Sequence, residues 1–358
     1  MSILALETSC DDTCAAVIEA DGSVRANVIS SQTAHEDFGG VVPEIASRHH
    51  LEIVNAIVAR ALELADTELD EIELIAATQG PGLIGALLVG LSTAKALASA
   101  RELPFAPVDH LQGHVAANFL RGATGSESGG ASEATPAEPF EPPFLCLIAS
   151  GGHTLLTHVR EHDGFEVLGR TLDDAAGEAF DKGARMLGLG YPGGAALERL
   201  AREGDAEAFV FPGSRGERAK GGRGASRQAF AEGLDFSFAG LKTALLYRLR
   251  ELSEQEASAR AADLAASYQA AIVDSLVARA ERGLEQTGLD RLAVGGGVAA
   301  NGALRERLAE LGVTLHVPAR VLCTDNAAMI ASAARYGKRL DYPDYLGLDA
   351  YASGEVAR

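Results

Sequence analysis

Two histidines spaced by four, His110 and His114, are the residues whose types and spacing most directly suggest chemistry. On a helix, residues four apart lie on the same face, so both imidazoles could bind one ion. A carboxylate far along the chain, Asp325 in Cys-Thr-Asp-Asn-Ala-Ala, could complete a metal site with open positions. The alternative is that one histidine caps a helix and the other packs in the core.

The same spacing occurs in the zinc-peptidase motif His-Glu-X-X-His, which makes peptide hydrolysis a hypothesis to weigh. In this chain Leu111 stands where that motif keeps its general-base glutamate. Without that carboxylate a bound ion would lack the base that activates water. We therefore predict that the chain is not a peptidase of this kind.

The composition is that of a globular protein with room for two lobes, each with its own core. The chain has 358 residues, 47% of them hydrophobic, with 40 glycines and no tryptophan. Its first residues lack the pattern of a leader, and no stretch is apolar enough to span a bilayer. We expect a soluble cytoplasmic protein that does not bind membranes. The scattered cysteines predict reduced thiols: Cys10, Cys14, Cys146 and Cys323.

The formal charge of −19 argues against a surface built broadly for nucleic acid. One segment from Gly213 to Gln228 runs against this trend, because only Glu217 opposes its basic residues. Loops of this kind are usually just solvated, so an RNA role needs independent support. The basic residues are Arg215, Arg218, Lys220, Arg223 and Arg227.

A low-complexity stretch, residues 122–143, divides the chain into two halves. It has almost no aromatic or branched aliphatic residues, so we expect a linker or surface excursion. The expected domains are therefore residues 1–121 and 144–358, with the last helices free to pack on the first lobe.

The two halves follow one plan: strands around a polar turn, helices, a further strand, a glycine turn and a helix. The first half predicts strands at 3–7, 15–19, 24–30 and 74–78, and helices at 42–65 and 84–100. The second predicts strands at 144–149, 155–159, 165–169 and 292–294, and a helix at 299–311.

This repeat predicts two similar α/β lobes with a nucleotide cleft between them. Backbone amides in small polar turns and at helix starts can hold phosphate without a charged side chain. One glycine turn alone is ordinary loop punctuation. Turns in matching positions of both halves favour nucleotide binding.

At this point the chain resembles the tRNA N6-adenosine threonylcarbamoyltransferase family (TsaD, formerly O-sialoglycoprotein endopeptidase). That resemblance implies two duplicated lobes of the actin-like, sugar-kinase-like ATPase (ASKHA) fold. The motifs that carry it cover nearly the whole length outside the linker and the basic loop. They are residues 7–11 (Glu-Thr-Ser-Cys-Asp), 39–44, 80–83, 110–114, 150–154 (Ser-Gly-Gly-His-Thr), 173–182, 235–243 and 323–326.

The resemblance implies that His110, His114 and Asp325 hold one Fe²⁺, with Zn²⁺ as the other candidate. It implies catalytic roles for Asp11 and Asp12, although relatives commonly carry glutamate where this chain has the shorter Asp12. It also implies a pocket for threonylcarbamoyl-AMP, which could take ATP or ADP as well. The implied pocket residues are Ile148, Ala149, Ser150, Gly151, Gly152, Asp181, Gly194, Glu198 and Asn301.

The implied reaction is transfer of the threonylcarbamoyl group from threonylcarbamoyl-AMP to the exocyclic N6 of adenosine 37. The acceptor tRNAs read codons that start with A. The mixed anhydride is already activated, so orientation, charge stabilisation and exclusion of water suffice without an enzyme nucleophile. The implied partners are tRNA, a TsaB-like paralogous subunit and a small TsaE-like ATPase.

Two rival functions stay open from the sequence. An ATP hydrolase or small-molecule kinase of the same fold would explain a nucleotide site but has no use for His110 and His114. A non-catalytic TsaB-like scaffold would share the lobes but would not need the complete set with Asp325.

Overall fold

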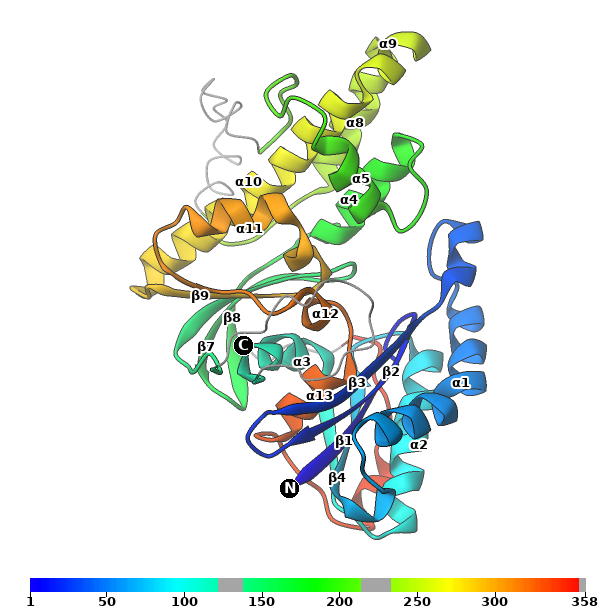
Figure 1. Ribbon diagram of the computed structural model, residues 1–358. Coiled ribbons are helices and arrows are strands. Elements are labelled where there is room, and N and C mark those ends of the chain that lie inside the picture. Colours follow the sequence, from blue (N-terminus) through cyan, green and yellow to red (C-terminus); the bar gives the residue numbers. More distant parts are fainter. Residues whose placement is uncertain (122–137, 214–232, 354–358) are drawn as a thin grey trace. The chain divides into compact units, whose positions relative to one another are not determined.

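A computed structural model describes residues 1–121, 138–213 and 233–353 of the chain (Figure 1). The basic residues at 215–227 and most of the predicted linker, residues 122–143, lie outside these ranges. The chain divides into two compact units. The first comprises Met1–Pro143, Val159–Glu166 and His316–Arg358, and the second comprises Phe144–His158 and Val167–Leu315.

The sheet of the first unit has the order β3-β2-β1-β4-β5. Strand β1 pairs antiparallel with β2, β2 antiparallel with β3, and β1 parallel with β4, which pairs parallel with β5. This mixed sheet places the ends of β1 and β4 beside the start of β2. The strands are β1 (Ser2–Glu7), β2 (Asp12–Glu19), β3 (Val24–Ser31), β4 (Ile72–Gly80) and β5 (Phe105–Asp109).

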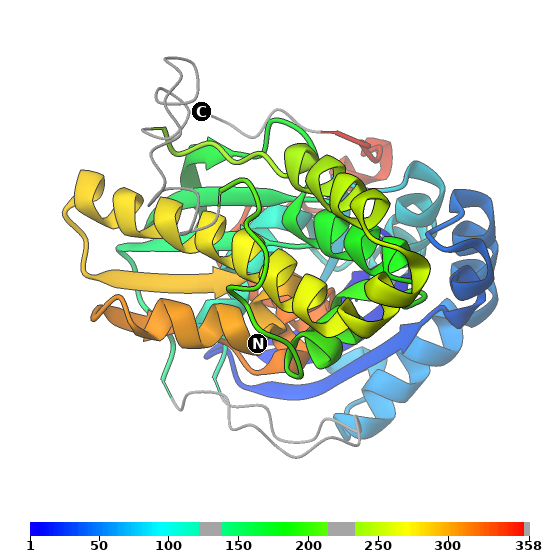
Figure 2. The same cartoon turned by 90° about the horizontal axis from the view of Figure 1, so that it is seen from above.

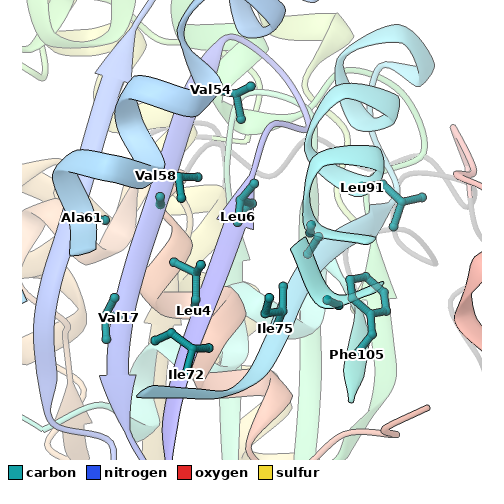
Figure 3. Close-up of a cluster of buried hydrophobic side chains, with 14 of the residues drawn as sticks. Leu4, Leu6, Val17, Val54, Val58, Ala61, Ile72, Ile75, Leu91 and Phe105 are labelled. Carbon is teal, nitrogen blue, oxygen red and sulfur yellow. The ribbon is translucent and has the colours of Figure 1, made fainter. Parts of the chain in front are cut away.

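Helices α1 (Pro43–Leu64) and α2 (Ile84–Ala100) cover one face of this sheet. Proline at the first position of α1 suits a helix start, because its missing N–H has no partner there anyway. Leu4 and Leu6 of β1 pack against Val54 and Val58 of α1, as Figure 3 shows. Each such fully buried aliphatic side chain contributes roughly 1.5–3 kcal/mol to folding.

The C-terminal part of the chain packs in the first unit. Helix α13 (Ala327–Ala334) contacts β1, β2 and β4, and none of its residues belongs to the cluster under α1 and α2. All eight of its residues are buried. With both faces covered, β1 carries a continuous apolar run from Ile3 to Leu6.

The second sheet has the order β10-β9-β6-β7-β8. Read from its other edge, as β8-β7-β6-β9-β10, it repeats the order of the first sheet. The predicted duplication is therefore confirmed at the level of strand order. Helix α10 (Ala261–Thr287) contacts β6 and β9 and lies along the sheet in Figure 2. The strands are β6 (Phe144–Ala149), β7 (Thr154–Glu161), β8 (Gly164–Arg170), β9 (Arg291–Gly295) and β10 (Thr314–His316).

The remaining helices are shorter. They are α3 (His110–Ala116), α4 (Ala176–Met186), α5 (Gly193–Ala201), α8 (Ala239–Glu251), α9 (Glu254–Ala259), α11 (Gly302–Ala309) and α12 (Arg320–Cys323). The helix predicted from 299 instead begins as a 3-10 turn at Gly297–Ala300, and α11 starts only after Asn301. Among the described helices, none is both long enough and apolar enough to cross a membrane.

The described end of the predicted linker packs against the first unit. Phe140 is buried, its backbone N–H donates to the Asn118 carbonyl, and its ring stacks on His316 at 4.9 Å. Phe140 therefore anchors the described end of this stretch, residues 138–143, in the first unit. The four cysteines are free thiols, as predicted.

Candidate metal centre

Helix α3 begins where β5 ends, and Asp109 fixes that start. Its carboxylate accepts hydrogen bonds from the backbone N–H of Leu111 (2.8 Å) and Gln112 (3.1 Å), which caps the helix. Tyr351 holds the same carboxylate, because its hydroxyl donates to the other oxygen at 2.7 Å. The two histidines are therefore presented on one helix face, with ring centroids 4.7 Å apart.

The predicted ligand atoms converge. Asp325 Oδ1 lies 3.3 Å from His114 Nε2 and 3.6 Å from His110 Nε2, and the three ligand atoms lie within 4.8 Å of one another. Donor atoms about 2.1 Å from a tetrahedral ion are about 3.4 Å apart. The spacing thus fits a single cation.

A close helix contact brings Asp325 to this place. Asn326 caps α13 by accepting from Met329 N–H (2.9 Å), so Asp325 stands directly before the helix. Helices α3 and α13 touch at Gly113, where an added Cβ would lie 2.8 Å from the Ile330 side chain. A glycine between the two histidines lets the carboxylate approach them.

The polar groups of this centre fit a cation. His114 is fully buried, yet neither ring nitrogen has a hydrogen-bond partner among the residues that the structure describes. Burial by itself would lower the pKa of His110, but the carboxylates of Asp325 and Glu7 outweigh it and raise the pKa to about 9. The centre is thus a negative environment with an unsatisfied buried imidazole, which is what a bound cation would relieve.

The turn between β1 and β2 carries Asp11 and Asp12. Burial raises the pKa of Asp12 to about 7, and nearby carboxylates, Asp325 foremost, add to this effect. A hydrogen bond with Ser31 opposes the shift. A carboxyl group with a pKa near neutrality can give or take a proton under physiological conditions.

His50 holds this turn from α1. It occupies a stripe of buried α1 residues and donates from Nε2 to the Cys10 carbonyl at 3.0 Å. Its Nδ1 accepts from the Thr13 hydroxyl at 2.7 Å. Accepting at Nδ1 requires the neutral ring, and burial lowers the pKa of His50 below its ordinary value of 6.5.

We predict that His50 makes folding more sensitive to acid. A lowered pKa in the folded state means that its stabilising contribution is complete above about pH 6.5 and is lost as the pH falls below that value. The free energy of unfolding should fall more steeply between pH 7 and 5 in the unmodified protein than in His50→Gln. Parallel pH profiles of the two proteins would contradict this prediction.

The second unit holds the residues predicted to bind the nucleotide, and Ile148 to Gly152 lie where β6 ends. At Gly151 and Gly152 an added Cβ would meet no atom of the described residues within 4 Å. The backbone of the two preceding residues, Ala149 and Ser150, is instead tightly packed. A Cβ on Gly296, whose φ is +85°, would lie 2.3 Å from the Ala149 carbonyl, and one on Gly177 would lie 2.6 Å from the Ser150 carbonyl.

Two of the predicted pocket residues, Asp181 and Glu198, accept hydrogen bonds from backbone N–H groups at helix starts in this unit. Asp181 accepts from the backbone N–H of Gly193 (2.9 Å) and Gly194 (3.2 Å). Glu198 accepts from Gly302 N–H at 3.1 Å and pairs with Arg202.

Asn301, another of the implied pocket residues, has both ends of its side-chain amide engaged. Its amide N–H donates to Gln269 at 2.9 Å, and its side-chain oxygen caps α11 by accepting from Leu304 N–H. Asn is one of the residues preferred directly before a helix, where its side-chain oxygen accepts from a backbone N–H of the first turn. These contacts fix Asn301 at the start of α11.

Sequence reasoning gave no role to His50 or to Glu7. The sequence held a signal for each. His50 falls within the apolar stripe of α1 and Glu7 ends the apolar run of β1, and a polar residue at such a position is buried only if it has polar partners.

Comparison with solved structures identifies the fold. (R)-2-hydroxyglutaryl-CoA dehydratase component A from Acidaminococcus fermentans is similar with a TM-score of 0.52 and 13% identity, covering 97% of this chain and 99% of that chain. Full-length HypF, in a phosphate- and nucleotide-bound form, gives 0.55 and 14%, covering 99% and 56%. The fold is the two-lobed α/β fold of the actin-like ATPases.

Sequence comparison defines the family. A family model described as TsaD, tRNA N6-adenosine threonylcarbamoyltransferase, matches residues 23–332. Proteins of that name from Clostridium perfringens (strain SM101 / Type A) and Clostridium botulinum (strain 657 / Type Ba4) are each 45% identical to the chain. The alignments cover 93% and 94% of this chain, and 92% of each relative. The chain belongs to the tRNA N6-adenosine threonylcarbamoyltransferase family, a family of transferases.

Proposed function

We propose that this protein transfers the threonylcarbamoyl group from threonylcarbamoyl-AMP to N6 of adenosine 37 in tRNAs that read codons starting with A. Membership of the family supports the reaction class. The observation that carries the proposal is the convergence of His110, His114 and Asp325 on one point. A phosphotransferase of the same fold has no use for such a set.

The donor set favours Fe²⁺, with Zn²⁺ as the alternative. Two imidazoles and one carboxylate with open positions are typical of non-haem Fe(II) sites, and imidazole also suits zinc. When bound, the divalent ion would supply Lewis-acid charge to stabilise negative charge on the carbonyl of the donor.

The reaction needs a proton acceptor, because the attacking amine loses a proton as AMP leaves with the bonding electrons. Asp12 is suited to accept that proton, since its pKa of about 7 leaves a useful fraction ionised at neutral pH. Asp11 shares the same turn and would supply further negative charge beside the amine. His50 would keep both carboxylates in place by holding Cys10 and Thr13.

The adenylate is assigned to the second unit. The open space above Gly151 and Gly152 would let their backbone approach its phosphate. Ile148, Ala149 and Ser150 lead into that loop. Asp181, Gly194, Glu198 and Asn301 frame the helix starts beside it and remain the residues proposed to contact the nucleotide.

The protein is proposed to act with a TsaB-like paralogous subunit and a TsaE-like ATPase. Its charge of −19 disfavours unaided tRNA binding, so a local basic segment of the chain or a partner subunit has to supply a cationic surface. The basic residues at 215–227 are candidates. Reversing the charge of Arg215, Arg218 and Arg223 should then weaken tRNA binding and reduce its salt dependence, whereas unchanged binding would exclude them.

Reconstitution tests the function. The purified protein, both partner subunits and threonylcarbamoyl-AMP should modify an unmodified tRNA at adenosine 37, detected by mass spectrometry of the nucleosides. A matched tRNA with guanosine at position 37 lacks the acceptor amine and should stay unmodified. ATP turnover independent of tRNA, without modified adenosine, would instead favour a hydrolase or kinase.

A further inference from the structure

Glu7, the last residue of β1, is a buried carboxylate beside the candidate metal centre. Only 1% of its surface is exposed, and it follows four apolar residues of the strand, Ile3 to Leu6. Its Oε2 lies 3.1 Å from His110 Nδ1. The first residue of α3 thus meets the last residue of β1 through one imidazole and one carboxylate.

Backbone and side-chain donors hold this carboxylate on its other sides. The Thr78 hydroxyl, from the neighbouring strand β4, donates to Oε2, and the backbone N–H of Ser9 donates to Oε1. A carboxylate with both oxygens engaged has no freedom to rotate away from His110. Its position is therefore set by the sheet, which is the most rigid part of this unit.

The contact determines which nitrogen of His110 carries the proton. An ionised carboxylate only accepts hydrogen bonds, so Nδ1 must be the protonated nitrogen. When His110 is neutral, as a metal ligand must be, Nε2 keeps its lone pair, and Nε2 is the atom that lies 3.6 Å from Asp325 Oδ1. Histidines that bind metals commonly donate their second N–H to a carboxylate in this way.

His114 provides an internal contrast. Its Nδ1 has no hydrogen-bond partner among the described residues. Its orientation is instead enforced by packing, since the ring is completely buried. Among the described residues, a buried carboxylate therefore anchors Nδ1 of His110 but not Nδ1 of His114.

We propose that Glu7 is a positioning residue for the metal centre, which fixes the tautomer and ring orientation of His110 so that Nε2 faces the ion. This inference rests on the metal role proposed above for His110, His114 and Asp325. A purely structural role is the rival explanation, because Glu7 also joins β1 to β4 through Thr78 and closes the turn at Ser9.

Metal titration of the metal-free protein separates these explanations. We expect Glu7→Gln to raise the dissociation constant for Fe²⁺ or Zn²⁺ by about 10- to 100-fold, the usual effect of losing such a partner. Thr78→Val removes a structural bond to Glu7 but keeps the carboxylate. Ser9→Ala removes the hydroxyl that lies 3.2 Å from His110 Nδ1. Both controls keep the Glu7 carboxylate, so they should weaken metal binding much less than Glu7→Gln does.

The outcomes distinguish this inference from the proposed function. If Glu7→Gln binds metal as tightly as the unmodified protein, or if Thr78→Val weakens binding equally, the positioning role is wrong while the metal centre stands. If the unmodified protein binds no divalent ion, both fail. If the metal centre and the positioning role hold but no transfer occurs, only the proposed reaction fails.

One measurement needs no substitution and so stays decisive even if Glu7→Gln does not fold. Two-bond ¹H–¹⁵N correlation spectra report which imidazole nitrogen is protonated. In the zinc-loaded, unmodified protein we expect His110 to carry its proton on Nδ1 and to bind zinc through Nε2. Zinc on Nδ1, or a proton on Nε2, would overturn the proposal.

Discussion

Replacing His110 with alanine should lower threonylcarbamoyl transfer by about a thousand-fold or more, because it removes one of three protein ligands. That loss corresponds to roughly 4 kcal/mol of transition-state stabilisation, within the range expected of a catalytic cation. Metal content should fall in parallel. Initial rates of modified adenosine formation and metal analysis of the same preparations measure both effects.

His162→Ala is the matched control for this variant. His162 lies in the same unit, where it pairs with Glu141 and stacks on Tyr336, but it is not part of the ligand set. Its loss should leave metal content and transfer unchanged. Transfer at the normal rate by metal-free His110→Ala would mean that the ion is not needed for the reaction.

Gly296→Ala should destabilise the second unit by about 2 to 3 kcal/mol. Its positive φ strains any side chain, and the new Cβ would lie 2.3 Å from a backbone carbonyl that cannot yield cheaply. The free energy of unfolding, measured in urea, checks this expectation. A value equal to that of the unmodified protein would show that the end of β6 is not held against the glycine turn.

Gly151→Val provides the contrasting case in the same loop. Because open space lies above Gly151, this change should alter the free energy of unfolding by no more than about 0.5 kcal/mol. If the adenylate phosphate occupies that space, its affinity should drop by about 10- to 100-fold, equivalent to a steric cost of about 1–3 kcal/mol. Unchanged affinity would place the phosphate elsewhere.

The repeated fold was readable from the sequence because each half buries an alternation of strands and helices with its own turn signals. The return of a last helix to the first lobe was allowed for, but nothing in the sequence of α13 itself indicates it. Its sequence, Ala-Ala-Met-Ile-Ala-Ser-Ala-Ala, is apolar all round and so indicates burial without indicating which sheet covers it. The contact that decides the matter joins Gly113 and Ile330, more than 200 positions apart.

The ligand set was also predictable only in part, because local sequence patterns link two of its three residues. His110 and His114 share a helix, so local spacing alone puts them together. Asp325 was assigned through family motifs, because no local pattern links it to that helix. Glu7 and His50 were not assigned, since a single polar residue in an apolar segment shows that a partner exists without showing which residue it is.

A crystal structure of the metal-loaded protein, with anomalous scattering recorded at the absorption edge of the metal, tests the central claim most directly. We predict a single peak about 2.0–2.2 Å from His110 Nε2, His114 Nε2 and a carboxylate oxygen of Asp325. A peak bound by other residues, or none at this centre in protein that retains one equivalent of metal, would contradict the account.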